Sequence, residues 1–168
     1  ERQFDNQYKI MSVLLMMFAG LLFLALVSYT TKDEVNAQIN LKQLVELAFG
    51  NEELEAKAAT THNWLGIFGA FLSNFLINGT IGYAVYLFPI IIIIWSRYLF
   101  TGAKIPNGTI RRTYIFLILS LIFATATASL QKLAMFAHFE KELSGSIGQY
   151  LSWLLVSTTG MAGALILM

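Results

Sequence analysis

The chain has no cysteine, only two histidines and few charged side chains among its 168 residues. The lack of cysteine excludes disulfides, thiolate metal sites and cysteine nucleophiles. Charged residues make up 12% of the chain, whereas soluble domains carry roughly 25%. Hydrophobic residues make up 57%. This composition predicts an integral membrane protein, and the net charge of +1 says nothing about nucleic acid.

Ionisable side chains are also missing from the apolar cores of the chain. Pumps, proton-coupled transporters and voltage sensors place such groups inside the membrane, so their absence argues against these classes. There is no GxxxxGK[ST] loop for ATP hydrolysis. His62 and His138 stand apart in the sequence, and His62 fits a hydrogen-bonding role at a membrane boundary. We therefore expect no catalytic, cofactor-binding or metal-binding residue in this chain.

Four apolar blocks follow one another, each near the ~20 residues that a spanning helix needs. Helices satisfy their own backbone hydrogen bonds in lipid, so they are the expected structure. We predict an all-α integral membrane fold with four transmembrane helices, at about residues 10–29, 80–98, 113–131 and 147–168. Residues 1–168 are treated as a single membrane-anchor domain.

The longest apolar run, His62–Phe100, is too long for one helix. A straight helix over it would measure about 55 Å, against a hydrocarbon core of roughly 30 Å. The run must break, and Asn78-Gly79 is the place where a bend is cheapest. We predict an interfacial or partly embedded helix at 64–77, followed by a spanning helix that Pro89 kinks. If both halves crossed the bilayer instead, there would be five spans, with the termini on opposite sides.

Small residues at helical spacing mark possible close contacts between helices. One stripe lies in the predicted helix 64–77, and two further pairs lie in the third and fourth blocks. The pairs could pack within one chain or between copies. These residues are Gly66, Gly69, Ala70 and Ser73 for the stripe, and Ala124 with Ala128 and Gly160 with Ala164 for the pairs.

The connections between the blocks differ in charge. Residues 30–63 carry six acids against three lysines, and an amphipathic pattern at 41–48 ends at Gly50. Asn51, followed by three glutamates, reads as a helix N-cap. We predict a small extracytoplasmic helical cap at 35–60. Its apolar face would lie on the membrane surface or the helix ends, unless the cap is a solvated hairpin.

A second connection carries only positive charge, which is typical of cytoplasmic loops. With four spans, a cytoplasmic basic loop places both termini in the cytoplasm and the cap outside. The basic residues are Arg97, Lys104, Arg111 and Arg112.

Two motifs in this order resemble the N-terminal membrane domain of FtsK/SpoIIIE-type DNA translocases. The first comprises HNWLGIFGAFL at 62–72 and GYAVYLFP at 82–89; the second comprises GSIG at 145–148 and GMAGA at 160–164. Ser144 stands where the family often has glycine, and Val85 is interposed before Tyr86. The motif residues are His62, Asn63, Gly66, Gly69, Ala70, Gly82, Tyr86, Pro89, Gly145, Gly148, Gly160 and Gly163.

The resemblance implies a membrane-anchoring and septum-targeting domain in a bacterial cytoplasmic (inner) membrane. It implies a C-terminal motor, absent from this chain, that uses ATP and Mg to move double-stranded DNA in cell division and chromosome segregation. The motor would make the hexamer and contact DNA, while the outward loop and helices would meet other division proteins. Because the chain begins at Glu1 and ends within an apolar run at Met168, we expect a longer polypeptide.

Two other classes fit the same pattern of apolar helices. One is a small four-helix subunit of a transporter or channel, for which Asn74, Asn78, Thr80 and Tyr83 form the polar cluster that could line a path. The other is a tetraspan membrane assembly factor that binds a partner through the acidic first loop.

Overall fold

The computed structural model describes residues 2–39, 42–43, 46, 49–132 and 141–166. Every regular element in these residues is a helix, which confirms the all-α prediction. Three helical stretches in the described part are long and apolar enough to cross a membrane: Asn6–Val27, Gly82–Thr101 and Asn107–Gln131.

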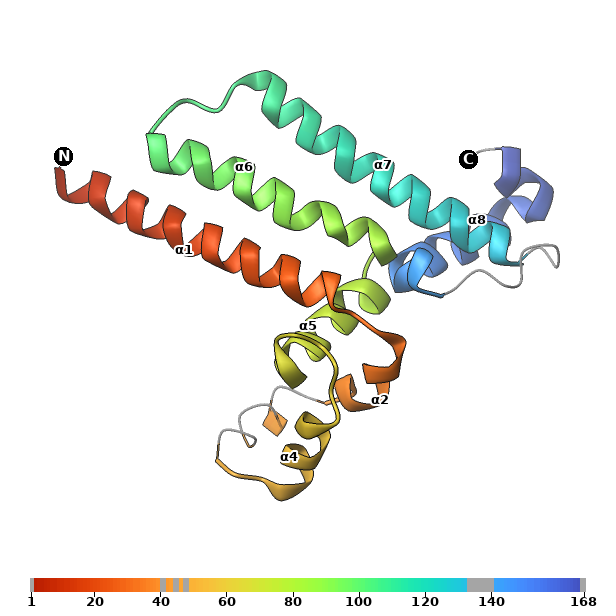
Figure 1. The fold of residues 1–168 in the computed structure, drawn as a ribbon. Helices are drawn as coiled ribbons and strands as arrows, with labels where there is room; N and C mark the ends of the chain where they lie inside the picture. The colour runs from red at the N-terminus through yellow and green to blue at the C-terminus, as the bar shows by residue number, and fades with distance from the viewer. Residues whose placement is uncertain (1, 40–41, 44–45, 47–48, 133–140, 167–168) are drawn as a thin grey trace.

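The long helices pack as two pairs. α1 (Arg2–Val27) lies along α6 (Leu87–Thr101), and α7 (Asn107–Lys132) packs against α8 (Gly145–Ile166). Figure 1 shows α1, α6 and α7 running side by side, with the start of α1 and the α6–α7 connection at the same end of the molecule. Gly102 ends α6 in the left-handed conformation (φ 63°), the usual way for glycine to end a helix.

The long apolar run breaks where the sequence predicts. α5 (Gly66–Gly79) ends at Gly79, and the chain turns through Gly82 (φ 67°) into a short 3-10 helix, η2 (Gly82–Tyr86). A helix of 14 residues is about 21 Å long, too short to span a ~30 Å core. α5 lies at the end of α1 and α6 rather than beside them (Figure 1). This arrangement does not support the five-span alternative.

The prediction that Pro89 kinks the spanning helix is wrong. The α-helical part starts at Leu87, so Pro89 lies in its first turn, where backbone N–H groups have no partner within the helix. A proline there costs no helical hydrogen bond. The sequence placed the start of the helix at residue 80, seven residues before Leu87, because the turn at Gly82 leads into a 3-10 helix rather than an α-helix.

The cap after α1 is built from short helices: η1 (Thr31–Asp33), α2 (Glu34–Ala37) and α4 (Glu52–Ala59). Asn51 Oδ1 accepts the Leu54 N–H at 3.3 Å, as expected of an N-cap. The cap packs on the helix ends, because Ile39 and Leu54 form a buried cluster with Ile67 of α5. The predicted amphipathic helix at 41–48 lies largely outside the described residues.

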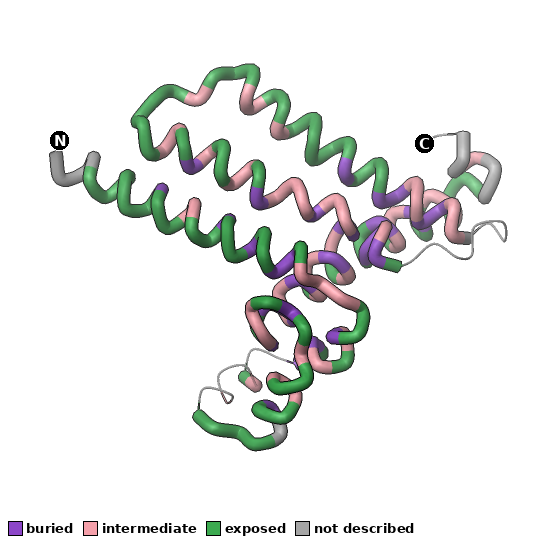
Figure 2. Tube along the Cα trace, in the orientation of Figure 1, coloured by how far each residue is buried: buried purple, intermediate pink, exposed green. Residues whose placement is uncertain are grey.

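Burial is concentrated where the helices meet rather than along their length. A core of Leu22, Leu26, Ile77, Ile81, Val85 and Ala124 joins α1, α5, η2 and α7. In Figure 2 the buried residues gather at this meeting point, while the far halves of α1 and α7 are mostly exposed and that of α6 is a mixture of exposed and partly buried residues. Large apolar side chains make up most of this exposed surface, apart from the cations near the α6–α7 connection, as expected of helices that face lipid.

α8 differs from a regular antiparallel span in two ways. Gly160 has non-helical angles (φ 72°, ψ 169°) that interrupt it. In addition, Gly148 lies against Ala124, and the Ser152 and Ser129 hydroxyls are hydrogen-bonded. Over these residues α8 therefore runs in the same direction as α7, not antiparallel to it. The end of α8 therefore lies far from the start of α1 (Figure 1), instead of returning to it.

Candidate functional site

The first motif and the start of the second come together in three dimensions. They lie where the end of α1, both ends of α5, η2 and the start of α8 meet, and we call this region the junction. In the described residues no group of three or more His, Asp or Glu side chains could hold a metal ion. Hydrogen bonds and close backbone packing hold the junction together.

Asp33 is the most heavily bonded side chain of the junction. It is only 2% exposed, and both its oxygens accept the His62 N–H at 3.0 Å. Oδ2 also accepts the Asn63 N–H at 2.9 Å, and Oδ1 lies 3.1 Å from the largely exposed His62 ring at Nδ1. Buried carboxylates need such donors, because an unpaired buried charge is costly. Asp33 thus joins the two ends of the cap.

Asn63 ties the start of α5 to the end of α1. It is 5% exposed, donates from Nδ2 to the Ala25 carbonyl at 2.9 Å, and accepts the Leu65 N–H at 3.1 Å. Gly69 faces it so closely that a Cβ at residue 69 would overlap the Asn63 amide. The Asn63 amide therefore requires a glycine at residue 69.

A tyrosine of the first motif also binds the end of α1. The last carbonyls of a helix lack partners within it, and two of these carbonyls in α1 accept motif side chains. Ala25 accepts from Asn63, and Leu26 accepts from the Tyr86 hydroxyl at 2.6 Å. The end of α1 is thereby fixed to the segments on both sides of α5.

The two motifs interlock through glycine backbones. Gly82 lies against Glu142 and Leu143, and a Cβ there would meet the Leu143 carbonyl carbon at 2.6 Å. A Cβ at Gly145 (φ 60°) would meet the Thr80 carbonyl carbon at 2.7 Å. The Ile147 N–H donates to the Thr80 carbonyl at 2.9 Å. Only glycine permits this approach, because both residues also have positive φ.

Ser144 does not disturb this turn. It is fully buried, and its hydroxyl donates to the Lys141 carbonyl at 3.2 Å. No non-glycine residue in the described part has positive φ. The positive φ belongs to Gly145, so the serine fits where the family often has glycine.

A polar cluster lies beside this contact. Asn78 Nδ2 donates to Glu34 Oε1 at 2.9 Å, to Asn74 Oδ1 at 2.6 Å and to the Tyr29 hydroxyl oxygen at 3.2 Å. The Tyr29 hydroxyl in turn donates to Glu34 at 3.0 Å. Burial, and to a smaller extent Glu34, raises the pKa of Tyr29, which follows the end of the span at Val27. The tyrosine therefore stays a protonated donor.

A polar hollow of about 250 Å³ opens beside the polar cluster. Asn78 Oδ1 is buried next to it and has no hydrogen-bond partner among the described residues. The Ser146 hydroxyl donates to the Asn78 carbonyl at 2.7 Å. Asn74 and Asn78, two of the four polar residues that could line a transport path, thus bond to each other, and Asn78 also bonds to Tyr29 and Glu34. A third, Thr80, donates to the Leu76 carbonyl of α5. The hollow is lined by Glu34, Gln38, Asn74, Asn78, Lys141, Gly145, Ser146 and Gln149.

The remaining small residues of the motifs do not take part in the contact between Gly82 and Gly145. Gly66 (φ 62°) opens α5 with nothing near its Cβ position, while Ala70 is buried. Gly148 packs on the Ala124 backbone, so a Cβ would lie 2.7 Å from the Ala124 carbonyl carbon. Gly160 has open space around it, and a Cβ at Gly163 would meet only its own helix, at Thr159.

The predicted basic loop is mostly helix. Arg97 lies in α6, Arg111 and Arg112 lie in the first turns of α7, and only Lys104 lies in the connection. All four are exposed. The sequence therefore correctly predicted that these charges lie at one end of the molecule, but it predicted a longer loop than the structure has.

The sequence also missed residues of the junction. Asp33 and Glu34 looked like two of six acids in a polar connection, and Tyr29 was only the last residue of the first predicted span. Apart from the bond between Tyr29 and Glu34, their partners lie 29 to 49 residues away in the chain, and no local pattern marks such long-range bonds. The only hint was their position directly after a spanning helix.

The comparison with known families agrees with the motifs. A family model described as the 4TM region of DNA translocase FtsK/SpoIIIE matches residues 6–168. No curated protein and no solved structure matches the chain. The matched residues include the whole junction and all the described spans.

Proposed function

The chain belongs to the 4TM region of the FtsK/SpoIIIE DNA translocases, and we propose that it anchors such a translocase in the bacterial inner membrane at the division septum. The observation that carries the proposal is the match over residues 6–168. The junction supports it, because its bonds fix helices to one another and leave an apolar exterior for lipid. Helices fixed to one another with an apolar exterior are what a membrane anchor requires.

In this proposal the chemistry belongs to a motor outside this chain. The motor would bind ATP and Mg, assemble as a hexamer and pull double-stranded DNA in chromosome segregation. The family favours this reading over a channel subunit or an assembly factor. The internal bonding of Asn74 and Asn78 is consistent with packing rather than with conduction.

The proposed orientation places both termini and the basic end of the molecule in the cytoplasm. The charges on Arg97, Lys104, Arg111 and Arg112 support it through the positive-inside rule. A cytoplasmic C-terminus needs one more crossing after α7. For that crossing the proposal depends on the 4TM description of the family, since α8 runs with α7 over residues 148–152.

A fluorescent fusion of residues 1–168, expressed without a motor in dividing bacteria, tests the septal role. We expect enrichment at the septum over the lateral membrane. A matched pair of controls is Gly82→Ala, whose Cβ would overlap the Leu143 carbonyl, and Gly102→Ala, which has a similar positive φ but no atom within 4 Å of its Cβ position. An even distribution of the unaltered fusion around the cell would overturn septum targeting.

The cap is the proposed surface for other division proteins. Its ends meet, because Asn36 Nδ2 donates to the Thr60 hydroxyl at 3.1 Å, so residues 37–59 can be replaced by a short Gly-Ser linker while Asp33 and His62 stay in place. We expect this variant to insert in the membrane but to lose co-purification of division proteins. Unchanged co-purification would remove the cap from the proposal without affecting the anchor.

A further inference from the structure

A long groove separates α6 from α7. Two hydrogen bonds hold the helices together near the basic end of the molecule: Trp95 Nε1 donates to Thr113 Oγ1 at 3.2 Å, and the Tyr98 and Thr109 hydroxyls lie 3.2 Å apart. Elsewhere α6 and α7 touch much less than α1 and α6 or α7 and α8 do. Between them lies a hollow of about 610 Å³, within the roughly 300–1,000 Å³ of small-molecule sites.

The lining of the groove changes from apolar to polar along its length. Its deep part is formed by Leu87, Ile90, Ile91, Ile94 and Phe116, and its mouth by Tyr98, Thr109, Arg112 and Thr113. Ile90, Ile94 and Phe116 are 50%, 41% and 50% exposed, so the groove opens sideways toward lipid. From Leu87 to Tyr98 it extends about 16 Å, half of the ~30 Å hydrocarbon core. It is therefore as deep as one leaflet.

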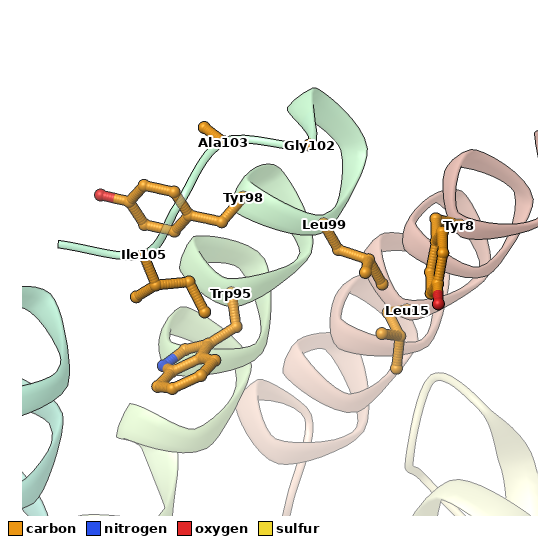
Figure 3. A pocket seen from close by; sticks show the side chains of 8 residues that line it. All are labelled: Tyr8, Leu15, Trp95, Tyr98, Leu99, Gly102, Ala103 and Ile105. Atoms are coloured by element: carbon orange, nitrogen blue, oxygen red, sulfur yellow. The ribbon is translucent and has the colours of Figure 1, made fainter. Parts of the chain in front are cut away.

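The mouth carries unmatched positive charge. Residues 96–113 contain four basic side chains and no acid, and no ion pair to Arg112 is found among the described residues. A second hollow of about 430 Å³ lies next to the mouth and shares Tyr98 with the groove. Figure 3 shows Trp95, Tyr98 and Ile105 on one side of α6, and Leu99 facing Leu15 and Tyr8 of α1. Tyrosine and tryptophan are enriched at the depth of lipid headgroups, so we expect the headgroups near these rings.

We propose that the groove between α6 and α7 binds an anionic phospholipid, with an acyl chain against Leu87–Ile94 and the phosphate at Arg112. The apolar depth fits one chain in one leaflet, and arginine with neighbouring hydroxyls is suited to a phosphate. The inference goes beyond anchoring and targeting. It requires only that α6 and α7 cross the bilayer.

Trp95 makes the site measurable. Trp64→Phe and Trp153→Phe leave Trp95 as the only tryptophan, because the chain has three. The 168-residue chain is reconstituted in bilayers that contain either brominated phosphatidylglycerol or brominated phosphatidylcholine, and quenching of Trp95 is compared. We expect about fivefold preference for phosphatidylglycerol, as ~1 kcal/mol per basic contact implies.

Two matched pairs of variants locate the binding. Arg112→Gln should abolish the preference for phosphatidylglycerol, giving about equal quenching by the two lipids, whereas Arg112→Lys should retain the preference. Arg111→Gln should also retain it, because Arg111 does not line the groove. Ile94→Phe narrows the groove and should weaken quenching by either lipid. Ile93→Phe is its control, since Ile93 is similarly exposed (46%) but lies outside the groove.

Three results would overturn the proposal. The first is equal quenching by the two lipids in the unaltered chain. The second is an equal loss of preference in Arg111→Gln and Arg112→Gln, which would indicate surface charge alone. The third is quenching that rises as the protein is diluted into excess lipid, which would place a second copy of the chain in the groove. None of these results bears on septal localisation, so the two proposals fail separately.

Discussion

At the residue scale, Asp33 links the cap to α5. We predict that Asp33→Asn lowers the free energy of unfolding by about 2 kcal/mol, because hydrogen bonds to a charged acceptor contribute roughly 1.5–3 kcal/mol and an amide offers one oxygen instead of two. Thermal unfolding in detergent measures the change. Glu52→Gln in α4 is the control, since Glu52 is exposed and surface changes stay within about 0.5 kcal/mol. Equal stability of the two variants would contradict this role of Asp33.

A second residue-scale prediction separates glycine's backbone freedom from its small size. Gly66→Ala should lower the free energy of unfolding by about 1 kcal/mol, because its φ is 62° but its Cβ position is free. Gly82→Ala should lower it by about 3 kcal/mol or more, because a similar φ is combined with a Cβ that overlaps the Leu143 carbonyl. Unfolding of both variants under the same conditions gives the difference. Similar losses would mean that the approach of η2 to residues 142–143 is loose.

The same residues show what the sequence could tell. The motif glycines and Asn63 were identifiable as a set, yet their pairing was not, because Gly82 and Gly145 meet only after two spans are in place. Asp33 had no local signal at all. Polar bonds between distant segments depend on the final packing, whereas apolar length and small-residue spacing are properties of the chain itself.

At the scale of elements, the length of the apolar blocks predicted the helices, and the thickness of the bilayer predicted the break near Asn78-Gly79. The sequence did not predict where α6 starts, because a turn at Gly82 and a 3-10 helix lie between the break and α6. The small pair Ala124 and Ala128 was predicted to contact another helix, and it is buried (0% and 1% exposed) where α8 packs. This face of α7 is therefore occupied within one chain.

A disulfide tests that packing, and the absence of native cysteine makes the experiment clean. The Ser129 and Ser152 hydroxyl oxygens lie 2.7 Å apart, so Ser129→Cys with Ser152→Cys should form an intramolecular disulfide in membranes. Mass spectrometry and non-reducing gels report it. Ser120→Cys with Ser152→Cys is the control, because residue 120 lies about 13.5 Å from residue 129, toward the start of α7. A ladder of crosslinked oligomers would instead show that this face packs between copies.

At the scale of the whole molecule, charge and fold both define a direction across the membrane. Four exposed cations, Arg97, Lys104, Arg111 and Arg112, lie at the end where α6 meets α7, while the cap, with six acids against three lysines over residues 30–63, lies beyond the opposite end of α1. Because α1 separates these two groups and has the length of a span, we expect them on opposite sides of the bilayer. The positive-inside rule then predicts a cytoplasmic position for the cations, which is the orientation proposed above.

Single cysteines measure this orientation directly. In intact cells a membrane-impermeant maleimide should label Lys57→Cys but not Lys104→Cys, and only permeabilisation should expose the latter. A cysteine at Met168 reports the last crossing: protection in intact cells is the expected result, because a DNA motor works in the cytoplasm. Labelling of Met168→Cys from outside would mean that α8, interrupted at Gly160 and running with α7, does not cross. The chain would then hold its C-terminus on the side where no DNA motor could reach the chromosome.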